Sequence, residues 1–236
     1  MTVIEFIGDK STHIAVVPEI IPVDVCDGLI DLCKKDWTKL FFPGPTLGGL
    51  DTSIKNTMDF NFSGAQAKEL GCDFDAYFNY EMKIYNALWT SMSIYTEQFP
   101  AILSAPNLYD TGFRIQNYKM ANGFYRSHWD GAPWDDEPIG SRVLGVVMYL
   151  NDVNRGGETW FPTHNLKVKA TIGSIAIFPA NWTHPHQACV PISNDKWIIS
   201  SFICATKKSI LEKQLLNKNE VSVIDTNPAN QPCNQS

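Results

Sequence analysis

From about residue 112 onward, the chain reads as a series of short strands separated by turns. Five segments in this part are rich in β-branched and aromatic residues, namely FRIQNYKM, RVLGVVMYL, LKVKATIG, SIAIFP and KWIISSFICAT. Turn-forming stretches such as NRGGE and PISND lie between them. Because no helical pattern separates these strands, the sequence favours a β-sandwich or jelly roll over a parallel α/β sheet.

The preceding part of the chain, about residues 22 to 105, reads mostly as helix with loops. Asp24 is a candidate N-cap for a short helix over VDVCDGLIDLCKK. A longer helical pattern begins near Asp73, where apolar residues recur every three or four positions. We expect this stripe to be core that packs the helix onto a sheet. Its members are Phe74, Phe78, Met82, Tyr85, Trp89 and Met92.

We expect a single domain over residues 1–216, followed by a polar tail over residues 217–236. Within the domain, residues up to about 110 are expected to supply helical support and edge strands, and residues from about 111 to 206 the β core. The stretch SILEKQLLNK, shortly after this core, is a candidate for one last helix.

Charge and cysteine usage restrict the partners and the compartment. The 236 residues carry a net charge of -6 and no long run of Lys and Arg, which disfavours a nucleic-acid partner. No apolar run approaches the length of a membrane span, and the N-terminus lacks the pattern of a secretion signal. The six cysteines are scattered without a CxxC pair. We therefore expect a reduced, soluble, cytoplasmic protein with no membrane partner.

A histidine and an aspartate lie two residues apart in the segment YRSHWDGAPW. In a strand, alternate residues face the same side, so His128 and Asp130 can reach one point while Trp129 faces away. A third arm from His184 or His186 would complete the two-histidine, one-carboxylate set that binds non-haem Fe(II) and leaves three positions open. Taken alone, such a pair is more often a surface or hydrogen-bonded pair, and zinc accepts the same ligands.

Five features occur in order within residues 114–203, namely QNYKMANGFYRSHWD, RVLGVVMYLNDV, GGETWFP, VKATIGSIAIFP and HQACVPISNDKW. In this order they resemble the Fe(II)/2-oxoglutarate-dependent dioxygenases, specifically the prolyl 4-hydroxylase-like branch. Two departures show: Ala170 stands near the family's strand proline, and Asn194 and Asp195 replace the glycine before the KW pair. The resemblance implies a mainly β fold with flanking helices, a double-stranded β-helix (jelly roll) with the N-terminal helices packed on its major sheet.

The resemblance also implies a metal centre. It makes His128, Asp130 and His186 the catalytic ligands of Fe(II). His186 is preferred because it leads HQAC, which aligns with the family's ligand position, and because it precedes Lys196 by ten residues, the spacing of that branch. His184 is the alternative ligand, and otherwise we expect it to pack or to support the ligands from behind.

The same resemblance implies a pocket for 2-oxoglutarate. Lys196 matches the residue that pairs with the distal carboxylate of this co-substrate, and Tyr118, ten residues before the first ligand, matches a tyrosine that hydrogen-bonds it. Tyr149 and Thr159 stand at positions that line the pocket in relatives. Ser200 shares a strand face with Lys196 and is a further candidate contact. For each of these residues, ordinary barrel lining is the alternative.

The implied activity is hydroxylation of an unactivated C–H bond, with 2-oxoglutarate and O2 consumed, succinate and CO2 released, and ascorbate as reductant. A peptidyl proline is the first choice of substrate, so a peptide or protein partner is expected. Alternatives are another amino-acid, small-molecule or nucleobase substrate, another metal in a related barrel, or a non-enzymatic jelly-roll binding module. Trp134, Asp135 and Asp136 stand in a loop that covers the substrate in relatives. Because neutral imidazoles are needed, we expect activity to fall on acidification.

Overall fold

The computed structural model describes residues 4–46, 48–131 and 141–206. The strands of these residues form two sheets in which neighbouring strands pair antiparallel. The large sheet has nine strands in the order β1-β2-β12-β9-β14-β7-β5-β3, with β6 paired to β14. The small sheet has five strands in the order β11-β10-β13-β8-β4. The chain is therefore mainly β, as the run of short strands predicts.

The strands of the large sheet are β1 (Glu5–Phe6), β2 (Ala15–Val17), β3 (Phe42–Pro43), β5 (Met58–Phe62), β6 (Leu108–Asp110), β7 (Phe113–Tyr118), β9 (Ser141–Tyr149), β12 (Ile175–Pro179) and β14 (Lys196–Ala205). Those of the small sheet are β4 (Lys55–Asn56), β8 (Phe124–His128), β10 (Thr159–Phe161), β11 (Leu166–Val168) and β13 (His186–Ala188). The helices are α1 (Val23–Lys35), α2 (Trp37–Leu40), α3 (Gly64–Glu69) and α4 (Phe74–Gln98), with short 3-10 turns at Lys10–Thr12, Pro100–Ser104 and Pro162–His164.

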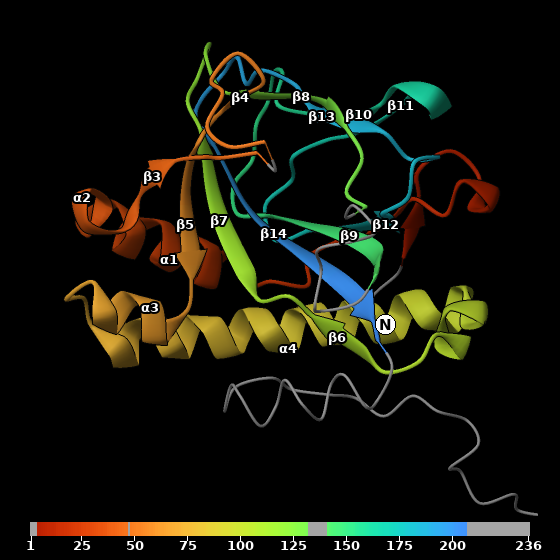
Figure 1. Ribbon diagram of the computed structural model, residues 1–236, viewed down its shortest axis with the longest axis horizontal. Helices are drawn as coiled ribbons and strands as arrows, with labels where there is room; N and C mark the ends of the chain where they lie inside the picture. The colour runs from red at the N-terminus through yellow and green to blue at the C-terminus, as the bar shows by residue number, and fades with distance from the viewer. Residues whose placement is uncertain (1–3, 47, 132–140, 207–236) are drawn as a thin grey trace, which may run out of the picture.

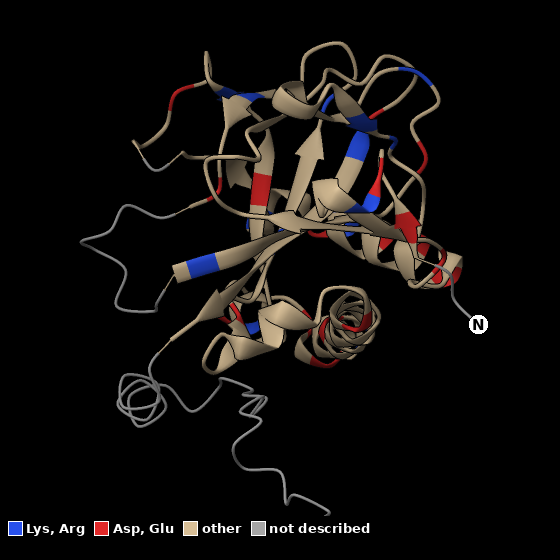
Figure 2. Cartoon of the chain, turned by 90° about the vertical axis from the view of Figure 1, so that its right-hand side faces the viewer, with Lys and Arg blue, Asp and Glu red and all other residues tan. Residues whose placement is uncertain are grey.

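The elements are arranged in three layers (Figure 1). The helices lie along one face of the large sheet, with α4 running beneath its strands, and the small sheet lies on the other side. Figure 2 looks nearly along α4 and shows the same order of helices, large sheet and small sheet; strands of the sheets carry both basic and acidic residues. The N-terminal helices therefore pack on the large sheet, as expected.

The main hydrophobic core fills the space between the helices and the large sheet. Ile115 on β7 and Ile199 on β14 are fully buried there against Leu29 of α1 and Leu88 of α4. Strand alternation produces this face, because every second residue of a central strand points toward the helices. The opposite face of the same strands points toward the small sheet.

Helix α4 begins after Asp73, whose side chain accepts a hydrogen bond from the backbone N–H of Ala76, as an N-cap does. The expected core stripe is wrong for the first half of this helix, where Phe74, Phe78 and Met82 are 36%, 44% and 41% exposed. The buried stripe is rotated to a neighbouring set of positions, because α1 and the large sheet cover that side of the helix, where the hydroxyl of Tyr77 donates to the carbonyl oxygen of Leu32. Its members are Tyr77, Ile84, Ala87, Leu88, Ser91, Met92 and Tyr95.

Two further expectations have a clear outcome. Asp24 is not the N-cap of α1, because the helix already begins at Val23 with Pro22 as its cap residue, and Asp24 lies in the first turn, where a carboxylate favours the helix dipole. Gly156 has a φ of 70° and Gly157 a φ of 73°, so both adopt the left-handed conformation that the turn before β10 requires.

Some expectations lie outside the described residues, namely the last helix over SILEKQLLNK, the tail over residues 217–236 and the loop with Trp134, Asp135 and Asp136. Among the helices of the described residues, none is both long enough and apolar enough to cross a membrane.

Candidate active site

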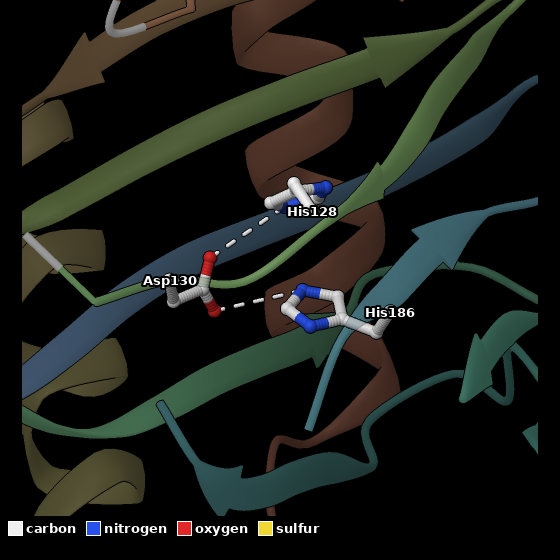
Figure 3. Close-up of side chains that lie close together, drawn as sticks. All are labelled: His128, Asp130 and His186. Carbon is white, nitrogen blue, oxygen red and sulfur yellow. Dashed lines mark ion pairs between the residues drawn. The ribbon is translucent and has the colours of Figure 1, made fainter. Parts of the chain in front are cut away.

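Two paired strands of the small sheet bring the histidines together. Strands β8 and β13 run antiparallel, and His128 at the end of β8 lies directly opposite His186 at the start of β13. Asp130 follows β8 by two residues, and its carboxylate faces both imidazoles (Figure 3). The Nε2 atom of His128 is 3.5 Å from Asp130 Oδ1, and the Nε2 atom of His186 is 3.5 Å from Asp130 Oδ2. Strand register therefore brings the two histidines together, and the short segment after β8 adds the aspartate.

Backbone carbonyls fix the orientation of both imidazole rings. The Nδ1 atom of His128 lies 2.8 Å from the carbonyl oxygen of Arg126, and that of His186 lies 3.2 Å from the carbonyl oxygen of His184. When each Nδ1 donates its proton to these carbonyls, each Nε2 carries a free lone pair toward Asp130. This is the tautomer that a metal ligand needs.

Electrostatics keep these groups in the protonation states that a cation requires. Burial lowers the pKa of His186, and the nearby Asp130 only partly opposes that shift. Burial by itself would raise the pKa of Asp130, but His186, His128 and Arg142 together bring it below its ordinary value. His186 therefore stays neutral and Asp130 stays ionised near neutral pH.

The donor set fits a divalent transition metal. One ligand atom from each of His128, Asp130 and His186 lies within 4.8 Å of the others, and in the described part of the chain this is the one such group of three or more His, Cys, Asp or Glu side chains. Two imidazole nitrogens and one carboxylate oxygen suit non-haem Fe(II), which such a set would hold while leaving coordination positions open for other ligands.

A cavity lies next to this group, between the large and small sheets. Both sheets and the loop after β8 contribute to its wall. Its polar lining consists of Gln116, Tyr118, Tyr125, His128, Asp130, Thr159, His186, Lys196 and Ser200. Its apolar lining consists of Val146, Val147, Ala188, Ile198 and Phe202. Four of the five residues predicted to hold a co-substrate thus line one cavity with the three histidine and aspartate side chains.

Lys196 is the most unusual residue of this cavity. Its side chain is fully buried, and among the described residues its Nζ atom has no hydrogen-bond partner. The ammonium group lies 5.2 Å from the ring centre of Tyr118 and 5.5 Å from that of Tyr149. Burial lowers the pKa of Lys196 to about 8. A buried cation facing a cavity without a counter-ion is suited to an anionic ligand.

Of the other residues predicted to contact the co-substrate, Tyr118, Thr159 and Ser200 line the cavity with Lys196, and Tyr149 lies behind its wall. The hydroxyl of Tyr118 donates a hydrogen bond to Gln116 Oε1 at 2.9 Å, and burial keeps its pKa well above the ordinary value. Tyr149 does not line the cavity itself; its hydroxyl lies 2.8 Å from Thr159 Oγ1, which does. Ser200 lines the cavity from the same strand as Lys196.

His184 points away from the group. Its Nε2 atom lies 2.8 Å from the carbonyl oxygen of Thr12, and its Nδ1 atom lies 2.8 Å from Thr183 Oγ1. Both ring nitrogens of His184 therefore contact other residues, and its backbone carbonyl oxygen lies within hydrogen-bond distance of His186 Nδ1. Its contacts are those of a residue that packs and supports a neighbour.

Sequence reasoning missed several residues of the cavity wall. Tyr125 stacks on the ring of His128, with centroids 3.6 Å apart. Gln116 lies two residues before Tyr118 on β7, so strand alternation was the signal that could have found it. No local pattern marks the ion pair of Lys55 and Asp59, which comes from the corner between β4 and β5.

Comparison with known proteins agrees with the geometry. Residues 113–204 match the sequence profile of the 2OG-Fe(II) oxygenase superfamily. A curated relative, the "Probable prolyl 4-hydroxylase 9" of Arabidopsis thaliana, is 30% identical over 122 residues, which cover 42% of this chain and 42% of the relative. In the curated relatives that match, the aligned part covers between 39% and 44% of their length.

Two solved structures are similar over most of the chain. The viral collagen prolyl hydroxylase of Paramecium Bursaria Chlorella virus-1, in its 2OG complex, has a TM-score of 0.59 at 19% identity and covers 85% of this chain and 99% of its own. A prolyl hydroxylase from Trichoplax adhaerens, bound to a hypoxia inducible factor peptide fragment, has a TM-score of 0.64 at 15% identity and covers 89% of each chain. At such identities the structures show a shared fold. Together with the profile match, they confirm the resemblance that the motifs indicate.

Proposed function

We propose that this relative of the prolyl 4-hydroxylase-like dioxygenases is itself an Fe(II)/2-oxoglutarate-dependent oxygenase that hydroxylates a peptidyl proline. The proposal rests on one arrangement of side chains. Ligand atoms of His128, Asp130 and His186 lie within 4.8 Å of one another beside a cavity. Lys196 lines the same cavity, and its buried Nζ atom has no hydrogen-bond partner among the described residues. In this proposal the two facing sheets are a double-stranded β-helix, a jelly roll that carries the iron at one end.

The proposed metal ligands are His128, Asp130 and His186. With Fe(II) bound there, 2-oxoglutarate and O2 supply the oxidising chemistry that hydroxylates a C–H bond and releases succinate and CO2, with ascorbate as reductant. The protein itself holds the imidazoles in the correct tautomer through the carbonyls of Arg126 and His184.

Lys196 is proposed to bind the distal carboxylate of 2-oxoglutarate. Its charge would then gain the counter-ion that it lacks among the described residues. Tyr118 supplies a hydroxyl that stays protonated at neutral pH and can turn from Gln116 to a carboxylate oxygen, since a charged acceptor is the stronger partner. Thr159 and Ser200 complete the polar wall, and Tyr149 holds Thr159 in place.

The substrate is proposed from the relatives. The relatives and solved structures named above are described as prolyl hydroxylases, and one of them is bound to a peptide. A peptide containing proline is therefore the first candidate. The second is another amino-acid, small-molecule or nucleobase substrate, for which the described residues offer no specific feature.

Succinate formation tests the proposal. Purified protein with Fe(II), ascorbate and 2-oxoglutarate should form succinate faster when a proline-rich peptide is present than when its proline-to-alanine counterpart is, and mass spectrometry should find a hydroxylated proline. His128→Ala should lower the rate at least about 100-fold, because a ligand of the metal is lost. His164→Ala is the matched control, since that imidazole bonds to the Thr183 carbonyl outside the cavity.

Three results would count against the proposal in different ways. A folded protein that binds neither Fe(II) nor 2-oxoglutarate is not an oxygenase. If His128→Ala forms succinate as fast as His164→Ala, His128 is not a ligand of the catalytic metal. Succinate formation without any response to proline peptides would keep the enzyme class and exclude the proposed substrate.

A further inference from the structure

A second pair of buried charges lies at the edge of the cavity, where the chain passes from the small sheet to the large one. Lys55 Nζ on β4 is 2.6 Å from Asp59 Oδ2 on β5, and the two side chains are 2% and 0% exposed. Thr57, between them, donates its hydroxyl to Asp59 Oδ1 at 2.7 Å. These contacts stabilise the turn between β4 of the small sheet and β5 of the large sheet.

The side-chain amide of Gln116 connects the carboxylate of this ion pair to the cavity. Asp59 lies opposite Gln116 in the register of β5 and β7, and Gln116 Nε2 donates to Asp59 Oδ2 at 3.5 Å. The other end of the amide, Gln116 Oε1, accepts the hydroxyl of Tyr118. Gln116 and Tyr118 both line the cavity, so the carboxylate of Asp59 lies directly behind its wall.

The charge of Asp59 matters at this position. Besides burial, Asp59 is the largest contribution that raises the pKa of Tyr118, so its charge acts on the hydroxyl group. A ligand carboxylate beside Tyr118 would meet the same negative charge across a buried path, where charges are screened much less than in water. Asp59 on its own would therefore oppose a dicarboxylate co-substrate.

We propose that Lys55 is the buried counter-charge that allows the distal carboxylate of 2-oxoglutarate to bind next to Asp59. Arg114 lies 3.9 Å from the same carboxylate oxygen of Asp59, but its side chain is 40% exposed and screened by solvent. Lys55 does not line the cavity, so it acts through Asp59 and is a positioning residue. This inference rests on the proposed function, because it requires 2-oxoglutarate in the cavity. It differs in kind from the role of Lys196, which faces the ligand.

Two ligands separate an electrostatic effect from a structural one. Anaerobic calorimetry of the Fe(II)-loaded protein would measure the Kd of 2-oxoglutarate and of 2-oxobutyrate, which has the same keto acid group but no distal carboxylate. In Lys55→Met, we expect the Kd of 2-oxoglutarate to rise about tenfold and that of 2-oxobutyrate to change by less than about twofold. Equal weakening of both ligands would mean that the cavity has been distorted, and would overturn the proposal.

Removing both charges should restore binding. In the double variant Lys55→Met with Asp59→Asn, the Kd of 2-oxoglutarate should return to within about threefold of the original. Lys119→Met is the matched control, because it breaks a Lys–Asp pair of 2.8 Å in which the lysine is 57% exposed and screened by solvent. It should change the Kd by less than about twofold.

The test remains decisive if Lys55→Met does not fold. Asp59→Asn and the double variant should then bind 2-oxoglutarate at least about as tightly as the original protein, and selective loss of 2-oxoglutarate binding in either would overturn the proposal.

If the unchanged protein does not bind 2-oxoglutarate with Fe(II) present, the proposed function fails. If it binds, and Lys196→Met weakens binding while Lys55→Met does not, only the role of Lys55 is wrong.

Discussion

The large sheet has two buried faces that differ in their chemistry. On the face toward the helices, Ile115, Met148 and Ile199 are fully buried in an apolar cluster with α1 and α4. On the opposite face of the same strands, Gln116 and Lys196 line the cavity beside the candidate metal site. The residues named on both faces are buried, but only the first face consists of side chains that gain free energy by burial.

This difference indicates what each face contributes. Apolar burial against the helices stabilises the fold, whereas a buried cation without a counter-ion opposes folding. The pKa of Lys196, lowered to about 8 by burial, reflects that cost. In the proposed function a ligand supplies the missing charge, so the helix face would serve stability and the cavity face binding.

The largest effect on stability is expected from the helix face. Leu88→Ala removes a fully buried side chain of α4 and should lower the free energy of unfolding by about 2–5 kcal/mol. Urea denaturation would measure it, and the Kd of 2-oxoglutarate at low temperature should not change. Leu50→Ala, at a site 61% exposed, is the control and should stay within about 0.5 kcal/mol. A matching loss of 2-oxoglutarate affinity in Leu88→Ala would show that the two faces are not independent.

The cavity face should give the opposite result. Lys196→Met should weaken 2-oxoglutarate binding about 100-fold, because the counter-ion of the distal carboxylate is lost. The same substitution should raise the free energy of unfolding of the ligand-free protein by about 1–3 kcal/mol at pH 7, because a buried unpaired charge is removed. Lys167→Met, on the exposed face of β11, is the control. Destabilisation by Lys196→Met would contradict the comparison of the two faces.

The pH dependence of 2-oxoglutarate binding should follow Lys196. The lysine is charged below its pKa of about 8 and neutral above it, so the affinity for the anionic ligand is present at neutral pH and lost as the pH rises. In calorimetric titrations, the Kd should rise toward about tenfold per pH unit above that pKa. A Kd that stays constant up to about pH 10, near the ordinary pKa of lysine, would mean that Lys196 is not perturbed in the free protein.

The smallest effect is expected behind the cavity wall. Tyr149→Phe removes the hydroxyl that lies 2.8 Å from Thr159 Oγ1, which leaves a buried threonine without that partner. The free energy of unfolding should fall by about 0.5–1.5 kcal/mol, and the Kd of 2-oxoglutarate should change by less than about threefold. A much larger rise in Kd would mean that the Tyr149 hydroxyl itself contacts the ligand.

Local sequence patterns predicted the fold class and much of the site. Short segments rich in β-branched and aromatic residues, without helices between them, indicate a mainly β chain. The two-residue spacing of His128 and Asp130 predicts that both side chains lie on one side. The choice of His186 over His184 came from the resemblance. In the structure His186 joins the group, and both ring nitrogens of His184 contact other residues.

Other features depend on contacts between distant segments. Two apolar stripes of α4 have helical spacing. The positions of α1 and the large sheet decide that the stripe with Tyr77 and Leu88 is buried rather than the one with Phe74 and Phe78. A helical pattern shows that an apolar face exists, but its rotation is set by the neighbours that cover it.

By itself, the sequence determined the strand-rich architecture, the helix that follows Asp73 and the close spacing of His128 and Asp130, because each of these follows from a pattern within a short segment. The choice of His186 and Lys196 needed the resemblance to a known family as well. Only the tertiary structure decided that Lys196 lies buried without a partner among the described residues, and that Lys55 and Asp59 stand behind the cavity wall. Burial and charge pairing arise where strands from distant parts of the chain meet, and no local pattern records which residues will meet there.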